Sequence, residues 1–171
     1  HMPLTALLFL AGTAAICALP PLNGFVSELL IYLGLFDGIA SGSDTLASAA
    51  ALTALALIGG VVVLAFTKLY GTVFLGSPRT HEVAKASEAD NHRIAAMALP
   101  LAGILFIGLF PQTAVSAVTR AAGFFIHHPA DAADYLLSPT LAAVSRTAWL
   151  LILVVGLLAW LRSRALRTRK V

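Results

Sequence analysis

A break inside a long apolar run restricts the fold of this chain more than any other feature. The run extends from about residue 5 to residue 36. Four residues unsuited to an apolar helix interrupt it: Pro20, Pro21, Asn23 and Gly24. Proline removes an amide donor and clashes with the preceding turn, so this stretch ends one helix and starts another. A carboxylate, Glu28, follows the break closely.

The composition places this run in a membrane. The chain is 59% hydrophobic and 11% charged, less than half of the roughly 25% charge of an average soluble domain. One continuous helix over residues 5–36 would be about 48 Å long, whereas the hydrocarbon core is about 30 Å thick. Two offset half-helices fit, provided that neighbouring protein or a wet cavity satisfies the backbone groups freed at the break.

Three further apolar segments follow the broken one, at residues 46–75, 94–110 and 140–161. We therefore predict an all-α fold: a polytopic membrane helix bundle of about four spans, the first a discontinuous helix, in a single membrane domain. The polar stretch 76–93 is predicted to be a solvated loop, with a helical part as the alternative. Residues 112–138 are mixed, and an interfacial helix is predicted there from apolar side chains at helical spacing: Val115, Val118, Ala122 and Phe125.

Basic residues are distributed unevenly between the two ends of this bundle. The tail 162–171 carries five of the eleven Lys and Arg, and the 76–93 loop carries three more. Alternating spans put both on one side, opposite Arg120 and Arg146, which predicts a multi-pass protein of a bacterial-type inner membrane with a cytoplasmic C-terminus. The tail is predicted to contact anionic lipid of the bilayer rather than nucleic acid.

Glu28 is the only acidic residue inside an apolar segment, and the other acids are predicted to lie in loops. A bare carboxylate in lipid costs at least about 2.5 kcal/mol, so an intramembrane acid is a functional candidate by default. Glu28 is therefore our candidate for a proton carrier. The alternative is that Glu28 stabilises the start of the second half-helix through its dipole and free amides.

Lys68 is the only basic residue well inside a predicted span. It lies about 10 Å from the end of that span at Leu75. We consider Lys68 as a second member of a proton path, since polar intramembrane groups mark pathways. The alternative is a lysine whose stem extends to the membrane surface.

The sequence contains no pattern typical of a catalytic centre, a metal site or a cofactor site. The cluster His127, His128, Asp131 and Asp134 resembles a metal site in composition only and lacks ligand spacing, so a solvated loop is predicted. The single cysteine, Cys17, excludes an internal disulfide, and no span carries the ligands for a haem or an iron–sulfur cluster.

Two motifs resemble a known family. LPPLNGFVSE runs from Leu19 to Glu28, with MPLTA and FLAG before it, and FLGSPR runs from Phe74 to Arg79. Both are similar to the late helices of the proton-conducting, antiporter-like membrane subunits of respiratory complex I, Mrp-type cation/proton antiporters, hydrogenase-4 and formate hydrogenlyase. They most resemble the hydrogenase-type branch.

The resemblance implies that the break belongs to the second discontinuous helix of that family, which helps to form the half-channel toward the outer face. Glu28 falls where family members place the ionisable group on this helix. Such members have about a dozen or more spans, with an earlier broken helix and a central glutamate–lysine relay that this chain lacks. The resemblance therefore implies a C-terminal fragment of a longer subunit, with Met2 internal, that could not translocate protons alone.

Three functions remain open at this point. The first is proton translocation within the membrane arm of a redox-driven complex, with other membrane subunits as partners and protons or sodium as the ion. The second is a subunit of a cation/proton antiporter without a redox partner. The third is a structural membrane fragment with no transport activity.

Overall fold

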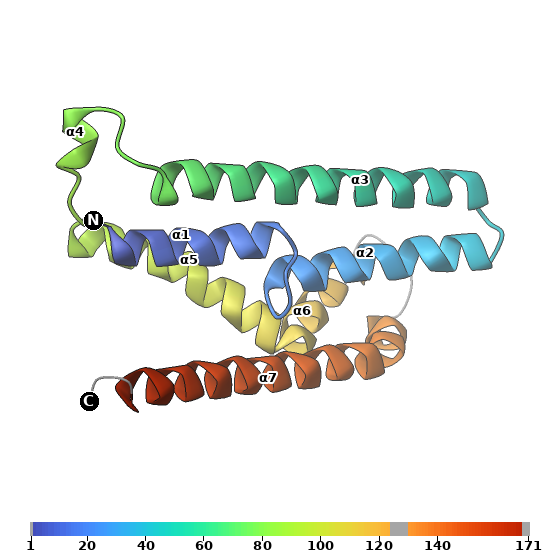
Figure 1. Ribbon diagram of the computed structural model, residues 1–171. Helices are drawn as coiled ribbons and strands as arrows, with labels where there is room; N and C mark the ends of the chain where they lie inside the picture. The colour runs from blue at the N-terminus through green and yellow to red at the C-terminus, as the bar shows by residue number, and fades with distance from the viewer. Residues whose placement is uncertain (1, 124–129, 169–171) are drawn as a thin grey trace.

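In the computed structural model, the first apolar run is divided into two helices, as its prolines require (Figure 1). α1 covers Pro3–Ile16 and α2 covers Asn23–Ala40. Pro3 starts α1 at a position where a missing amide costs nothing. The structure describes residues 2–123 and 130–168, with the backbone alone for 82, 84, 123, 130–136 and 166–168.

α3 (Thr45–Tyr70) returns antiparallel to the broken helix and extends beside both of its halves (Figure 1). Its last turn widens into a π-helical turn, Gly71–Leu75. A loop and the short α4 (His81–Ala84) then connect to α5 (Asn91–Leu109). α5 contains Pro100 and ends at Phe110, because the following proline cannot continue the helix.

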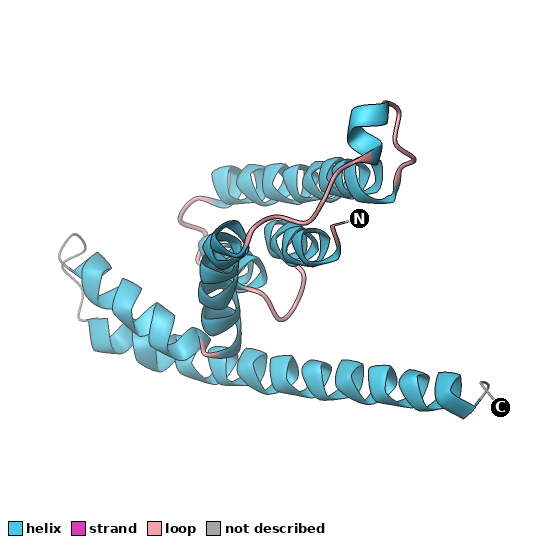
Figure 2. Ribbon diagram, turned by 90° about the vertical axis from the view of Figure 1, so that its left-hand side faces the viewer, coloured by secondary structure: helices cyan, strands magenta, loops and turns pink. Residues whose placement is uncertain are grey.

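α6 (Pro111–Gly123) and α7 (Ala130–Thr168) complete the described chain. The first part of α7 runs beside α6, and its second part extends past the other helices (Figure 2). A small core forms where α2, α6 and α7 meet, and its buried members are Val26, Val115, Leu141 and Val144. α6 is amphipathic, since Val115 is buried and Val118 is exposed. Phe125, predicted to share the apolar face, lies outside the described residues.

Four helical segments among the described residues are long and apolar enough to cross a membrane: Asn23–Ala40, Thr45–Leu75, Asn91–Leu109 and Leu137–Ala165. The predicted fold class, an all-α bundle of about four spans that begins with a broken helix, is confirmed. The chain is a multi-pass membrane protein.

Several acids predicted to lie in loops belong to helices instead. Asp37 is part of α2, because the helix continues until the Ser41 amide donates to the Asp37 carbonyl oxygen at 2.9 Å. Glu82 lies in α4. Asp131 and Asp134 lie in the first turns of α7. The predicted loop around them was wrong from residue 130 onward, and His127 and His128 lie outside the described residues.

The helix of the last span continues into the basic tail. α7 remains helical to Thr168, so residues 162–168 of the predicted tail belong to this helix. The start of α1, the 76–90 stretch and the end of α7 lie at one end of the molecule (Figure 1). The 41–44 turn and the start of α7 lie at the other.

Candidate functional site

The break begins with a left-handed residue that closes the end of α1. Ala18 has φ 52, and the Leu19 amide donates to the Ala14 carbonyl oxygen at 3.0 Å while the Ala18 amide donates to Ala15 at 3.2 Å. This is a Schellman arrangement, here with alanine where glycine is usual. A left-handed alanine costs about 1–2 kcal/mol. Two carbonyl groups at the end of α1 are thus satisfied within the chain, although the membrane layer offers them little water.

Two glycines allow the backbone to pack directly against the break. A β-carbon added at Gly24 would lie 1.9 Å from the Ala15 carbonyl oxygen, and one added at Gly108 would lie 2.0 Å from that of Pro21. Neither contact admits a side chain. Gly24 therefore lets the start of α2 meet the end of α1, and Gly108 lets α5 press against the proline pair. Sequence reasoning identified Gly24 as a helix breaker and missed Gly108.

α7 fixes the end of α5 that carries Gly108. The Ser145 hydroxyl donates to the Leu109 carbonyl oxygen at 2.9 Å, which satisfies one of the carbonyl groups that the end of α5 leaves without a partner in the helix. The Pro111 side chain is fully buried. The residues of the break therefore pack against the end of α1 and against α5, and α7 contacts the end of α5 through Ser145.

A cavity of about 470 Å³ lies beside the break. Its apolar walls include Leu55 and Val62 of α3 and Ile104 of α5. Its polar side chains come from the start of α2: Asn23, Ser27 and Glu28. The Ser27 hydroxyl donates to the Gly24 carbonyl oxygen at 2.9 Å. The helix break thus brings amide, hydroxyl and carboxylate groups to one hollow inside the spanning layer.

The Glu28 carboxylate points from α2 toward α3. A β-carbon added at Gly59 would lie 3.4 Å from Glu28 Oε1, so the glycine leaves room for the carboxylate. Tyr32, one turn further along α2, interacts electrostatically with Glu28. Glu28 lies beyond the first turn of α2, and among the described residues no side chain caps that helix.

Lys68 is not brought together with Glu28. Positions 59 and 68 of α3 are about 14 Å apart along the helix axis, and Lys68 is exposed and outside the cavity. Within the described part of the chain, Lys68 forms no ion pair. Its carbonyl oxygen accepts a hydrogen bond from the Thr72 hydroxyl at 2.9 Å.

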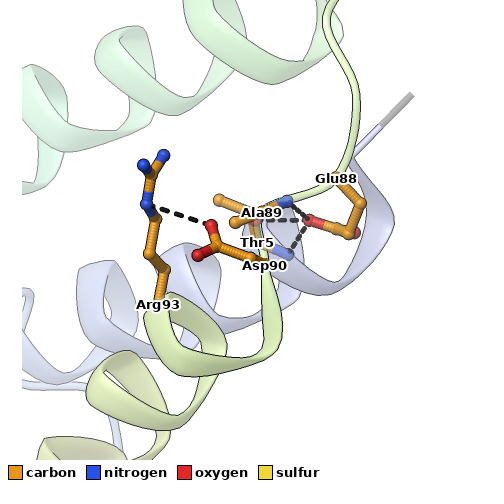
Figure 3. Close-up of polar contacts among 5 residues, drawn as sticks. All are labelled: Thr5, Glu88, Ala89, Asp90 and Arg93. Atoms are coloured by element: carbon orange, nitrogen blue, oxygen red, sulfur yellow. Dashed lines mark hydrogen bonds and ion pairs between the residues drawn. The ribbon is translucent and has the colours of Figure 1, made fainter.

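Glu88 has a structural contact that the sequence did not reveal (Figure 3). The Leu4 and Thr5 amides donate to its carboxylate at 2.7 and 3.2 Å, and the Thr5 hydroxyl donates as well. The hydroxyl hydrogen bond is the main cause that lowers the pKa of Glu88, with the amides adding to it. A carboxylate is also favoured at a helix N-terminus. The only available signal was that α1 begins without a capping side chain of its own.

The described residues contain no group of three His, Cys, Asp or Glu side chains placed to hold a metal ion. His127 and His128 lie outside this search, so the cluster considered from the sequence stays untested there.

Comparison with known proteins gives three relatives. Hydrogenase-4 component B of Escherichia coli (strain K12) is 37% identical over 131 residues, 75% of this chain and 20% of that protein. Formate hydrogenlyase subunit 3 of the same organism is 41% identical over 88 residues, 50% of this chain and 14% of that protein. NAD(P)H-quinone oxidoreductase chain 4 1 of Picosynechococcus sp. is 35% identical over 117 residues, 67% of this chain and 22% of that protein.

The chain thus spans about a fifth, or less, of the length of these relatives. No family model matches it, and no solved structure does.

Proposed function

Because this chain is a homologue of the antiporter-like membrane subunits, including hydrogenase-type members, we propose that it forms part of a proton path in the membrane arm of a redox-driven complex. The resemblance stated from the motifs is confirmed by these relatives. Hydrogenase-4, formate hydrogenlyase and NAD(P)H-quinone oxidoreductase are redox enzymes by name, which favours this function over an antiporter without a redox partner.

The observation that carries the proposal is the position of Glu28. It is a carboxylate inside the spanning layer that lines a cavity of about 470 Å³ together with Asn23 and Ser27. A water molecule occupies about 30 Å³, so the cavity has room for several. Water hydrogen-bonded to these polar groups would deliver protons to Glu28 and take them away, and the carboxylate would hold the proton between these steps.

The glycine at position 59 supports this role. Glu28 Oε1 faces a helix surface without a side chain, so the cavity leaves room for the carboxylate beside Gly59. Lys68 enters the proposal as a second member of the path. It lies about 14 Å further along α3 than Gly59, toward the end of the molecule that carries the start of α1.

The distribution of charge supports a cytoplasmic assignment for that end. Arg79, Lys85 and Arg93 lie near the start of α1, and the basic end of α7 lies there too. Cytoplasmic ends of membrane proteins carry the excess of Lys and Arg. We therefore place both the start of α1 and the end of α7 in the cytoplasm, with Glu28 beyond the break on the outward-leading half-helix.

The remaining parts of the path would come from outside these 171 residues. The chain matches about a fifth of the length of its relatives, and the apolar faces of α3 and α7 are widely exposed. We propose that other membrane subunits of the complex and lipid cover them.

The test is Glu28→Gln in the complete subunit within its complex, which removes the titratable proton and keeps the side-chain size. We expect proton uptake by inverted vesicles, per electron transferred, to fall, because glutamine cannot take up and release a proton. Subunit assembly should be unchanged. Asp37→Asn, on the same helix but outside the cavity, is the control.

Normal proton uptake in Glu28→Gln would remove Glu28 from the path. Loss of assembly in Glu28→Gln and in Glu28→Ala alike would favour the structural alternative. Cation-driven proton exchange by a purified complex that contains no redox subunit would favour the antiporter alternative.

A further inference from the structure

A second cavity lies at the end of the molecule near the start of α1, away from Glu28. Its volume is about 650 Å³. Most of its lining comes from the end of α3 and the residues that follow, and this lining includes most of the FLGSPR motif: Phe74, Gly76, Ser77, Pro78 and Arg79. Met2, Val83 and Ala86 close it from other sides. The proposed proton path does not use this motif.

The local backbone shapes this cavity. α3 ends in the π-helical turn Gly71–Leu75, where the Thr72 hydroxyl donates to the Lys68 and Leu69 carbonyl oxygens. A β-carbon added at Gly76 would lie 2.8 Å from the Thr72 carbonyl oxygen, so only glycine permits this exit from the helix. π-helical turns are rare and frequent at functional sites. The π-helical turn and Gly76 therefore shape the side of the cavity that α3 provides.

One wall of the cavity is apolar and held firmly. The Phe74 ring lies 5.3 Å, between centroids, from the rings of both Phe9 and Tyr70. This aromatic group joins α1 to the end of α3. Val73 and Val83 extend the apolar lining and are more than half exposed. An apolar cavity at the end of a spanning helix is a place where a lipid chain can lie.

The charge at the rim is positive and lacks a partner among the described side chains. Arg79 lines the cavity and forms no ion pair there. Two acids that follow Arg79 in the chain have partners elsewhere: Glu88 accepts hydrogen bonds from the start of α1, and Asp90 pairs with Arg93 at 3.0 Å (Figure 3). Among the described side chains the Arg79 guanidinium thus has no acidic partner, and a planar guanidinium matches a phosphate with two parallel hydrogen bonds.

We propose that this cavity binds an anionic phospholipid. Its phosphate lies on Arg79, and an acyl chain lies along Val73 and Phe74. A free phosphate would need only the guanidinium and would leave the apolar wall unused. The proposal is independent of the proton path, since Glu28 takes no part in it.

The experiment uses the complete subunit, purified in detergent and titrated with phosphatidylglycerol, with bound lipid counted by native mass spectrometry. Phosphatidylcholine and glycerol 3-phosphate are the comparison ligands. We expect phosphatidylglycerol to bind most tightly, and Arg79→Gln to weaken it about fivefold, the effect of one basic residue near a lipid surface. Arg93→Gln, at the same end but outside the cavity and paired with Asp90, should leave it unchanged.

A second pair of variants tests the apolar wall. Val83→Trp fills the cavity and should weaken phosphatidylglycerol binding, whereas Val118→Trp, at an exposed position of α6, should not. Four outcomes would overturn the proposal. They are equal binding of phosphatidylcholine, equal binding of glycerol 3-phosphate, equal weakening by Arg93→Gln, and no lipid on the complete subunit because another protein segment fills the cavity.

Discussion

The helix break and the second half of α7 are built in opposite ways. At the break, backbone packs on backbone, and Gly24 and Gly108 leave no room for even a β-carbon. From Trp149 to Ala165 of α7, every residue is exposed. The break is thus specified by contacts within this chain. The second half of α7 is specified by apolarity alone, and it needs lipid or further protein around it to be stable.

The largest expected effect comes from adding one methyl group in each region. Gly24→Ala places a β-carbon against the Ala15 carbonyl, and we expect it to destabilise the fold by about 3 kcal/mol. Gly156→Ala, in α7 with open space around it, should stabilise the helix by up to about 1 kcal/mol. Unfolding by increasing SDS in mixed micelles measures both. Equal effects at the two positions would show that the break is not closely packed.

A charge in the second half of α7 tests its surroundings. If lipid or apolar protein surrounds it, Leu153→Asp should oppose membrane insertion by about 2.5–3.5 kcal/mol, the cost of an acid at the centre of a span. Leu46 is also exposed but lies in the first turn of α3, so Leu46→Asp should oppose insertion far less. The inserted fraction in a microsomal glycosylation assay gives both values. An equally small effect at both positions would place this part of α7 in water.

The same contrast explains how far the sequence could predict the structure. The broken helix and the number of spans follow from local facts, namely prolines, glycine and the length of apolar runs. Glu28 was found because it is the only acid in such a run. Gly108 and Glu88 were missed because their partners, Pro21 and the start of α1, are remote in the sequence. No local pattern identifies a contact between residues 88 and 5.

The extent of α7 was underestimated for a related reason. Hydropathy marks where a span is apolar, whereas the helix ends where its hydrogen bonds end. Asp131 and Asp134 precede the apolar part, and the arginines after Leu161 follow it, yet all of these residues up to Thr168 are helical. Charged residues at helix ends are compatible with the dipole. The helix therefore extends beyond the predicted apolar span at both of its ends.

A smaller effect is expected from relieving strain at the break. Ala18 has φ 52, a left-handed conformation that glycine adopts without penalty. Ala18→Gly should therefore stabilise the protein by about 1 kcal/mol. Ala14→Gly, inside α1, should destabilise it by about the same amount, because glycine costs helix stability. The same substitution is made at two positions, of which one is left-handed and the other helical. The SDS unfolding midpoints should therefore move in opposite directions. Movement in the same direction would contradict a left-handed Ala18.

The smallest expected effect concerns the start of α1, which is held by hydrogen bonds to the Glu88 side chain and not by backbone packing. Hydrogen bonds from Thr5 and Leu4 hold the pKa of Glu88 below its ordinary value of 4.5. The stabilisation is therefore complete above that value and is lost as the pH falls through the lower pKa of the folded protein. Glu88→Gln should lower stability at neutral pH and reduce its loss in acid, whereas Asp44→Asn, at the far end of the molecule, should not. Thermal melts in detergent at pH 7 and at about pH 3.5 measure this difference. Identical acid sensitivity in wild type and Glu88→Gln would show that the Glu88 carboxylate does not hold α1 in place.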